Sequence, residues 1–597
     1  MIQHYDYEDL GGGVNLGAAP AQIPSKQMAA LENWYPYNTR LRRRGGVRRL
    51  TTGSAWSQNI TGMFPLKLAN GTWALLVGGP TAFGKYNEST LAVDDLTLGS
   101  GVVFPASTLP WTFFQYKNYA YAMRRNAGTM IRLTETSANR GGITAPTAAA
   151  TIAQGAAGAL PSGDYRTVYT YFNRATELES NPSPVSNTLS LGASRQIDYT
   201  GITASSDPFV DARRIYRTLE DQVGVYFFVD QIDDNVVTTY TGDQVLVADL
   251  GRTVSFNNGL PPSQLELGSV WNERLFATDG VDLFFSELLL VECFGDENVI
   301  PVFPDDGHRI RALHAFGDRL VIGKTNKVHY LVGTDASSFG IQTLSDKHGC
   351  MSHHSMHSAE SVLFWYGSGK AVFRSDGTSV TEISNPQVKP LLEAIPDELE
   401  EYVVGGVFPS RNWYVLSIPQ AAGANNSKVV VYNYKYNTWT VFTHPSDAPQ
   451  FLQDFFTESY GHVLYSTFYD GHLYHYADDD YTSDFGNDIV ATLTTKADDF
   501  GHPSYPKYLT ELRLLIPQVN GETILIEVLG GSGSAISSRS GSLDITGDDW
   551  KYYKLHTAGA PQSKLQTRLT YSGAPMIDLD QIHFVAGMVN RTMRRLS

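Results

Sequence analysis

The stretch from Trp271 to Tyr476 decides the fold class, because short aromatic strands there repeatedly end in glycine-containing turns. The repeated phrases are Arg319-Leu-Val-Ile-Gly, Ser361-Val-Leu-Phe-Trp-Tyr-Gly, Asn412-Trp-Tyr-Val-Leu-Ser-Ile-Pro and His462-Val-Leu-Tyr-Ser-Thr-Phe-Tyr-Asp-Gly. β-branched and aromatic residues favour strands, and Gly and Asp favour the turns between them. Small sheets repeated in this way indicate an all-β protein, and specifically a β-propeller, in which each blade covers the edges of the next.

Repeat units follow one another at roughly 40 to 50 residues, which is a typical blade length. We place them at 265–300, 308–345, 353–386, 401–445 and 453–480. Residues 51–142 carry the same strand pattern, as in Trp73-Ala-Leu-Leu-Val-Gly-Gly, and are expected to form the first blades. The predicted propeller therefore has six or seven blades, with one helical stretch at 387–401.

An insertion is predicted to split this propeller. Residues 139–159 are small and polar, which indicates a linker and places a boundary at about 142 to 160. Residues 160–262 then alternate in strands of about six to eight residues with Pro and Gly turns, the pattern of an immunoglobulin-like β-sandwich. The remaining blades are expected over 265–486, and a C-terminal β-sandwich over 487–597.

The composition excludes several classes of protein. A formal charge of -16 and a pI near 5.4 argue against tight wrapping of nucleic acid, which relies on clustered Lys and Arg. Two cysteines, Cys293 and Cys350, are too few for a disulfide framework and favour a reducing compartment. The first residues lack the features of a secretory signal, so we expect synthesis in the cytoplasm.

Residues 1–50 are expected to form an extended arm that carries a cluster of arginines. These are Arg40, Arg42, Arg43, Arg44, Arg48 and Arg49. Such a cluster in an acidic protein needs a partner, and the sequence leaves three open: carboxylates of the same protein on a solvated or intersubunit face, phosphate, or another acidic protein.

Four histidines and a thiol lie close together in His348-Gly-Cys350-Met-Ser-His353-His354-Ser-Met-His357. A zinc site would need three or four of them to converge, and neither a C-x₂-C pair nor an H-E-x-x-H motif is present. On a strand, His353 and His357 would share one face and His354 would lie on the other. Packing between blades is therefore favoured over a metal site.

Two further segments contain residues that could bind a metal or act in catalysis. Asp478-Asp-Asp-Tyr-Thr-Ser-Asp484-Phe-Gly-Asn-Asp488 is rich in possible calcium ligands but lacks the EF-hand order, so a solvated acidic loop is favoured. Ser375-Asp-Gly-Thr indicates a turn between strands. No G-x-S-x-G elbow, P-loop or dinucleotide fingerprint occurs. We predict no catalytic residue, metal or cofactor, and hence not an enzyme.

The order of these elements resembles the tail nozzle proteins of short-tailed bacteriophages, also called tail tubular protein B. The N-terminal residues that carry the resemblance are Gly12-Gly-Val-Asn15, Pro20, Pro24, Asn33, Trp34 and Arg44-Gly-Gly. Glu179-Ser-Asn-Pro-Ser-Pro and Arg213-Arg-Ile-Tyr-Arg-Thr are similar to the platform-type domain of phage tail proteins. Arg274-Leu-Phe, Ser286-Glu, Arg319-Leu-Val-Ile-Gly and Tyr330 are similar to blade motifs of the nozzles.

The resemblance implies a structural virion protein: a homo-hexamer below the portal that retains genomic DNA and then conducts it during ejection. Its partners would be the head-to-tail adaptor, tail fibre or spike proteins, the DNA in the lumen and the host outer surface. The six arginines would bind the adaptor or a neighbouring subunit. An acidic lumen would let the duplex slide, because it repels phosphate. The alternatives are a propeller glycosidase or depolymerase acting on host polysaccharide, and a monomeric surface-binding protein.

Overall fold

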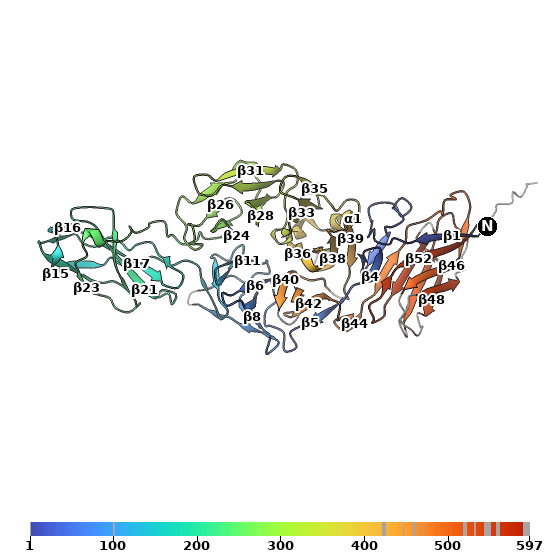
Figure 1. Ribbon diagram of the computed structural model, residues 1–597, viewed down its shortest axis with the longest axis horizontal. Helices are drawn as coiled ribbons and strands as arrows, with labels where there is room; N and C mark the ends of the chain where they lie inside the picture. The colour runs from blue at the N-terminus through green and yellow to red at the C-terminus, as the bar shows by residue number, and fades with distance from the viewer. Residues whose placement is uncertain are drawn as a thin grey trace, which may run out of the picture. The chain divides into compact units, whose positions relative to one another are not determined.

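The computed structural model describes residues 2–99, 102–420, 425–445, 447–457, 461–468, 470–516, 522–530, 533–542, 551–556 and 561–588. They form 52 β-strands, one short α-helix and five 3₁₀ helices (Figure 1). The prediction of an all-β chain is confirmed. None of the helices in these ranges is long and apolar enough to cross a membrane.

The chain divides into two compact units. Unit 1 comprises residues 1–95, 316–330 and 342–597, and unit 2 comprises residues 96–315 and 331–341. Unit 1 therefore joins the two ends of the sequence, whereas unit 2 is nearly continuous.

Two sheets of unit 1 are four-stranded antiparallel meanders. The first has the order β6 (Gly62–Lys67), β7 (Trp73–Gly78), β8 (Phe83–Asn87) and β9 (Ala92–Asp95). The second has the order β32 (His357–Ala359), β33 (Val362–Gly367), β34 (Ala371–Ser375) and β35 (Val380–Glu382).

A nine-stranded sheet of unit 1 combines a third meander with C-terminal strands. The meander is β36 (Val404–Phe408), β37 (Trp413–Pro419), β38 (Asn426–Asn433) and β39 (Thr438–Phe442). Next to it lie β2 (Ala30–Glu32), β45 (Ala491–Thr494), β50 (Gln566–Tyr571), β47 (Thr523–Leu529) and β48 (Ala535–Ser542). β2 pairs parallel with β39 and antiparallel with β45, so an N-terminal strand joins the two halves.

A six-stranded sheet is completed by another N-terminal strand. Its order is β40 (Phe451–Thr457), β41 (Gly461–Thr467), β42 (Leu473–Asp478), β5 (Gly46–Arg49), β43 (Ser483–Asp484) and β44 (Asn487–Asp488). β5 is antiparallel to β42, with Arg48 opposite His475. It therefore supplies the fourth strand of the β40–β42 meander (Figure 1).

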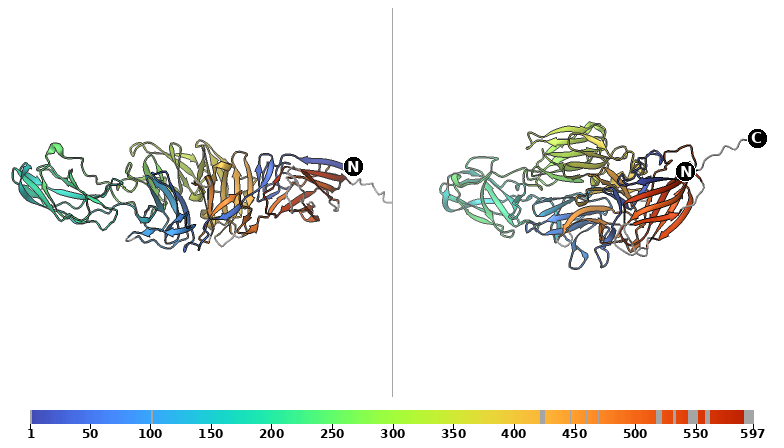
Figure 2. Two further views of the ribbon diagram at one scale, coloured as in Figure 1. Left: turned by 60° about the horizontal axis from the view of Figure 1, so that its bottom comes forward. Right: turned by 45° about the vertical axis from the view of Figure 1, so that its right-hand side comes forward.

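The C-terminal strands also pair with the start of the chain. One sheet has the order β1 (Ile2–Tyr7), β52 (Gln581–Met588), β46 (Lys507–Ile516) and β49 (Lys551–His556), with β1 lying along β52 (Figure 2). Another contains β3 (Trp34–Tyr37), β4 (Arg40–Arg43) and β51 (Asp578–Leu579). Buried residues of β46 and β52, such as Leu512 and Phe584, share one hydrophobic core with Ile526 of β47 and Leu569 of β50.

Residues 1–50, which were expected to lie as an arm on something, thus lie on the C-terminal half of their own chain. β1, β2, β4 and β5 each pair with a strand that begins at residue 438 or later, and β3 pairs with β4. Because these partners are hundreds of residues away, local sequence patterns do not reveal them.

The helical stretch predicted at 387–401 is present in two parts. α1 covers Lys389–Glu393 and a 3₁₀ helix covers Asp397–Tyr402. Pro396 separates them, because proline fixes its own backbone angle and disfavours helix at the preceding residue. The other 3₁₀ helices are η1 (Val247–Asp249), η2 (Pro304–Asp306), η3 (His353–Ser355) and η5 (Pro409–Arg411).

Unit 2 contains two sheets of the same small kind. One has the order β10 (Thr97–Leu98), β14 (Ser137–Arg140), β13 (Ile131–Leu133), β12 (Tyr119–Met123) and β11 (Thr112–Tyr116). The other is β24 (Leu267–Trp271), β25 (Arg274–Thr278), β26 (Asp282–Phe285) and β27 (Val299–Pro301). A further sheet, β28 (Ile310–Phe316), β29 (Arg319–Lys324), β30 (Val328–Val332) and β31 (Gly340–Ser345), has residues in both units.

The five repeats predicted between residues 265 and 480 each coincide with one group of strands. The groups are β24–β27, β28–β31, β32–β35, β36–β39 and β40–β42. Local alternation was sufficient to place them, because each blade-like group consists of consecutive strands joined by short turns.

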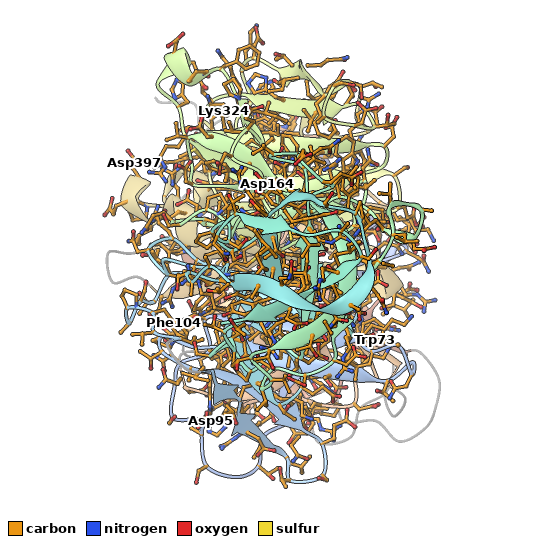
Figure 3. All side chains as sticks on the ribbon, turned by 90° about the vertical axis from the view of Figure 1, so that its left-hand side faces the viewer. Trp73, Asp95, Phe104, Asp164, Lys324 and Asp397 are labelled. Atoms are coloured by element: carbon orange, nitrogen blue, oxygen red, sulfur yellow. The ribbon has the colours of Figure 1, made fainter. Side chains whose placement is uncertain are left out.

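Residues 151–243 of unit 2 form three sheets that pair among themselves. They are β15 (Thr151–Leu160), β20 (Arg195–Thr200) and β23 (Tyr240–Asp243); β16 (Gly163–Tyr165) and β19 (Leu189–Leu191); and β18 (Leu178–Glu179), β17 (Thr167–Asn173), β21 (Ala212–Arg217) and β22 (Phe227–Ile232). Figure 3 shows this group, with Asp164 of β16 labelled. We call these the insert sheets.

The prediction of a linker up to residue 160 is wrong for residues 151–160, which form β15. Of its ten residues only Ile152 and Leu160 are buried, so the strand needs little apolar surface. Its small residues suit close approach: a Cβ on Gly158 would lie 2.8 Å from the backbone of Arg195. In β15 the small residues therefore permit tight pairing and do not form a linker.

Candidate functional site

The arginine segment, residues 40–49, consists of β4, a corner at Arg44 and Gly45, and β5. β4 forms a hairpin with β3, and its half-buried and buried positions alternate. The two glycines after Arg44 are needed for backbone contact. A Cβ on Gly45 would lie 2.3 Å from the Asp478 carbonyl oxygen, and one on Gly46 would lie 2.2 Å from that of Ser483.

The two outward-facing arginines of β4 bind one carboxylate of β51 and one directly after it. Arg40 Nε lies 2.7 Å from Asp580, and Arg42 makes a two-pronged pair with Asp578 at 2.7 and 2.9 Å. The hydrogen bonds to Asp578 raise the pKa of Arg42. Arg42 also lies 4.1 Å above the ring of Tyr37. A planar guanidinium suits both contacts.

Arg43 points inward and has no exposed surface. It donates to the carbonyl oxygens of Ala574, at 2.7 Å, and Thr482, at 3.2 Å. Burial lowers the pKa of Arg43. Its role is to connect the hairpin to two later segments of the same chain.

Arg44 is also fully buried and forms the centre of a polar network. It donates to the side-chain oxygen of Asn33 at 2.8 Å, to the Thr443 carbonyl at 2.7 Å and to both carboxylate oxygens of Asp484, one of them at 2.9 Å. Burial acts to raise the pKa of Asp484, but Arg44 outweighs this and lowers it. We call the contacts between Arg44 and Asp484 the closure pair.

His444 extends this network. Its Nδ1 lies 3.1 Å from Asp484, and its Nε2 lies 3.0 Å from the hydroxyl of Tyr476. Since a carboxylate only accepts, Nδ1 carries the proton and Nε2 accepts from Tyr476. Burial and the nearby Arg44 lower the pKa of His444. A neutral histidine thus connects the closure pair to β42.

Arg48 and Arg49 on β5 keep more contact with solvent. Arg48 lies 4.0 Å from Asp478, and Arg49 donates to the carbonyl oxygens of Thr51 and Gly53 and lies 2.7 Å from His472 Nε2. All six arginines therefore bind atoms of their own chain. Four of them, Arg40, Arg42, Arg44 and Arg48, face carboxylates of the same chain, as the first of the three alternatives expected. The expectation of a solvated face is wrong for Arg43 and Arg44, which are buried. Binding to an adaptor or a neighbouring subunit stays a prediction.

The acidic segment 478–488 is the counterpart of the arginine segment. Asp478 faces Arg48, Asp479 lies 2.8 Å from Arg411, and Asp484 pairs with Arg44. Within the described ranges, no group of three or more His, Cys, Asp or Glu side chains is placed to hold a metal ion. Sequence reasoning treated the two charged segments separately; their opposite signs were the signal that could have connected them.

The histidine cluster packs rather than converges. The His348 ring packs at a tilt against Phe373, with 4.5 Å between ring centroids, and the Cys350 thiol donates to the Ser352 carbonyl at 3.2 Å. His353 and His354 lie on the 3₁₀ helix η3, so the expectation of a strand across His353–His357 is wrong. Burial lowers the pKa of His354 to about 3.

The predicted turn at Ser375-Asp-Gly-Thr is confirmed between β34 and β35. Asp376 Oδ1 accepts from the Thr378 amide at 2.9 Å and from the Ser379 amide at 3.0 Å. A hydrogen bond from the Thr378 hydroxyl, together with these two amides, lowers the pKa of Asp376. The Asp376 carboxylate therefore stabilises the turn in which it lies.

The motifs quoted from the insert sheets are structural as well. Ser180, Ser183 and Ser186 each donate a backbone amide to a β17 carbonyl and accept a β17 amide on the hydroxyl. They thus pair with the free edge of β17 where Pro182 and Pro184 cannot donate. Glu179 accepts from Thr170, Tyr216, Arg214 and Arg252 at 2.5 to 3.0 Å.

Comparisons with known proteins do not assign the chain to a family. No family model and no curated protein matches the chain. Among solved structures, the computationally designed Ika8 protein is 12% identical, with a TM-score of 0.30, over 72% of this chain and 99% of that one. BamB from Moraxella catarrhalis is 9% identical, with a TM-score of 0.30, over 70% of this chain and 94% of that one. Structural similarities this weak indicate neither a family nor a function.

Proposed function

We propose that the chain is the tail nozzle protein of a short-tailed bacteriophage: a structural, non-enzymatic component of the virion tail. In this proposal it forms a homo-hexameric channel that retains genomic DNA and then conducts it during ejection. The adaptor binds one end of the ring, tail fibres or spikes bind its outside, and the host surface meets the distal end.

One observation carries the proposal: β5 supplies the missing strand of the β40–β42 meander. With it, seven groups of four or more strands follow one another: β6–β9, β10–β14, β24–β27, β28–β31, β32–β35, β36–β39 and β40–β42 with β5. A first strand that completes the last sheet is what a closed seven-bladed propeller requires, because closure removes the exposed edges.

The order of the remaining parts supports the same proposal. The insert sheets interrupt the series after its second group, where the resemblance places a platform-type β-sandwich. The C-terminal strands form two sheets around one core, as a second β-sandwich would. This order of parts supports the architecture that we propose, a split propeller with two attached domains.

Charge supports the role of a conduit. A chain with a net charge of -16 offers DNA few sites for tight binding, so a duplex can slide past it. The basic cluster that could have held DNA is largely neutralised, since Arg40, Arg42, Arg44 and Arg48 face carboxylates of the same chain.

Electron microscopy of the purified protein, or of the tail that carries it, tests the proposal. The expected result is a six-fold ring with an open axial channel. Single subunits, or a channel lined by lysine and arginine, would contradict it. The same preparation should release no reducing sugar from host envelope polysaccharide; release that depends on one pair of carboxylates would favour the glycosidase alternative instead.

A further inference from the structure

We infer that Glu292 is a buried latch that fixes how the insert sheets leave the sheets that carry them. The neck consists of the two connections, residues 141–143 and 258–261, between the insert sheets and their carrier sheets β10–β14 and β24–β27. This inference concerns unit 2 alone and holds whether or not the chain is a nozzle.

The carboxylate of Glu292 is 2% exposed and receives three donors from separate places. Tyr121 of β12 donates its hydroxyl to Oε1 at 2.8 Å, and Arg132 of β13 donates to Oε2 at 2.6 Å. Tyr121 and Arg132 lie directly opposite each other in the sheet, so they present both donors on one face. The third donor is the backbone amide of Gly142 in the neck, at 2.5 Å.

Arg132 carries the contact on to the insert. Its guanidinium carbon lies 3.3 Å from the centre of the Phe209 ring. Its Nη2 is buried and, among the described residues, has no hydrogen-bond partner, so the aromatic face is what this side of the cation contacts. Phe209 is held in turn by Asn173 of β17, which donates to its carbonyl at 2.6 Å.

The two connections of the neck run close together and leave no room for adjustment. Gly142 has a φ of +82°, and a Cβ there would lie 2.7 Å from Pro261. A Cβ on Gly259 would lie 2.4 Å from the Phe294 carbonyl, with which Gly259 also forms an isolated bridge. Residues 259–261 and 292–294 thus meet residue 142 at one point.

No insert strand continues into a carrier sheet among the described residues; apart from the Gly259–Phe294 bridge, their sheets are separate. The orientation of the insert sheets relative to the carrier sheets therefore depends on side-chain contacts. The Glu292 carboxylate is bonded to both the neck and a carrier sheet. Removing its charge leaves the Arg132 cation buried without a counter-ion and the Gly142 amide without a strong acceptor.

The test compares Glu292→Gln with Glu273→Gln in the full chain. Glu273 lies in the same carrier sheets but is exposed. Hydrogen exchange at Gly142 and Phe294 should accelerate at least about tenfold in Glu292→Gln, while exchange in β17 and β21 stays unchanged, because only the neck opens. Spin labels at Thr136 and Gln222 should report a narrow distance distribution that broadens only in this variant.

If Glu292→Gln does not fold, Phe209→Leu provides the same readouts, since it removes the aromatic face but keeps the buried pair. It should broaden the distance distribution without accelerating exchange in β17. The latch is refuted if the native distribution is already broad, if neither variant changes the neck, or if exchange rises equally throughout the insert sheets.

Discussion

Two buried arginine–carboxylate pairs occupy the places where the topology of the chain is decided, and they work differently. The closure pair, Arg44 and Asp484, lies beside paired strands, because β5 is hydrogen-bonded to β42 and Asp484 also accepts the Val47 amide. Arg132 lies on the paired strand β13, but its pair with Glu292 faces the neck, where the described residues form one isolated bridge, Gly259–Phe294. The same chemistry thus reinforces a backbone ladder in one place and replaces it in the other.

The largest effect should come from breaking the closure pair. Arg44→Met removes a cation that is fully buried and leaves Asp484 and Asn33 without their donor. We expect a loss of about 3 to 5 kcal/mol in the free energy of unfolding, as for other buried pairs that lose one partner. Urea denaturation measures it. Arg42→Met, with a partly exposed pair, is the control, and equal losses in both variants would contradict the distinction.

Backbone contact at the closure provides the next test. Gly46→Ala places a Cβ 2.2 Å from the Ser483 carbonyl oxygen, so β5 or β43 has to move. We expect a loss of about 1 to 3 kcal/mol, as for other overpacked sites. Gly53→Ala, at an exposed loop position where a Cβ would meet nothing within 4 Å and φ is not positive, is the control for adding the same carbon. If Gly46→Ala lowers the free energy of unfolding no more than the control does, the closure is not tightly packed.

Acid should weaken the closure. The folded pKa of His444 is held below its ordinary value of 6.5 by burial and by Arg44. Below pH 6.5 the unfolded chain therefore binds a proton that the folded chain refuses, and stability falls as pH falls, by at most about 1.4 kcal/mol per pH unit for this group. The protection factors of the β5 amides, which compare their exchange with the intrinsic rate at each pH, should therefore fall between pH 7 and 5.

His444→Gln should flatten this dependence, because it removes the titrating ring near Asp484 and Tyr476. The histidines on η3 contribute a separate acid sensitivity, since the pKa of His354 is also lowered. Unchanged pH dependence in β5 after the substitution would assign the effect to those residues instead.

The smallest effect on folding is expected from the arginines that keep contact with solvent. Arg40→Ala and Arg49→Ala should each cost no more than about 1 kcal/mol, because surface pairs contribute little. Thermal unfolding measures this. If these side chains bind the adaptor or a neighbouring subunit, Arg40→Glu with Arg49→Glu should leave the monomer folded but reduce ring assembly; normal assembly would remove them from the interface.

The sequence was sufficient for features that depend on neighbours in the chain. The strand groups from β24 to β42 were predicted because alternation and turn residues such as Gly367 and Gly377 are local signals. The Asp376 turn followed for the same reason. The closure pair was not predictable, because Arg44 and Asp484 are 440 residues apart. The latch at Glu292 was missed as well, since nothing near it in sequence distinguishes a buried carboxylate from an exposed one.

The pairing of β5 with β42 is the claim on which the account rests, and a designed disulfide tests it most directly. Arg48 and His475 are opposite residues of the two antiparallel strands, at a Cα separation of about 4.5 to 5.5 Å that a disulfide can span. Arg48→Cys with His475→Cys should therefore crosslink within one chain under mild oxidation. No crosslink, or a crosslink only between chains, would contradict closure of each subunit by its own N-terminal strand.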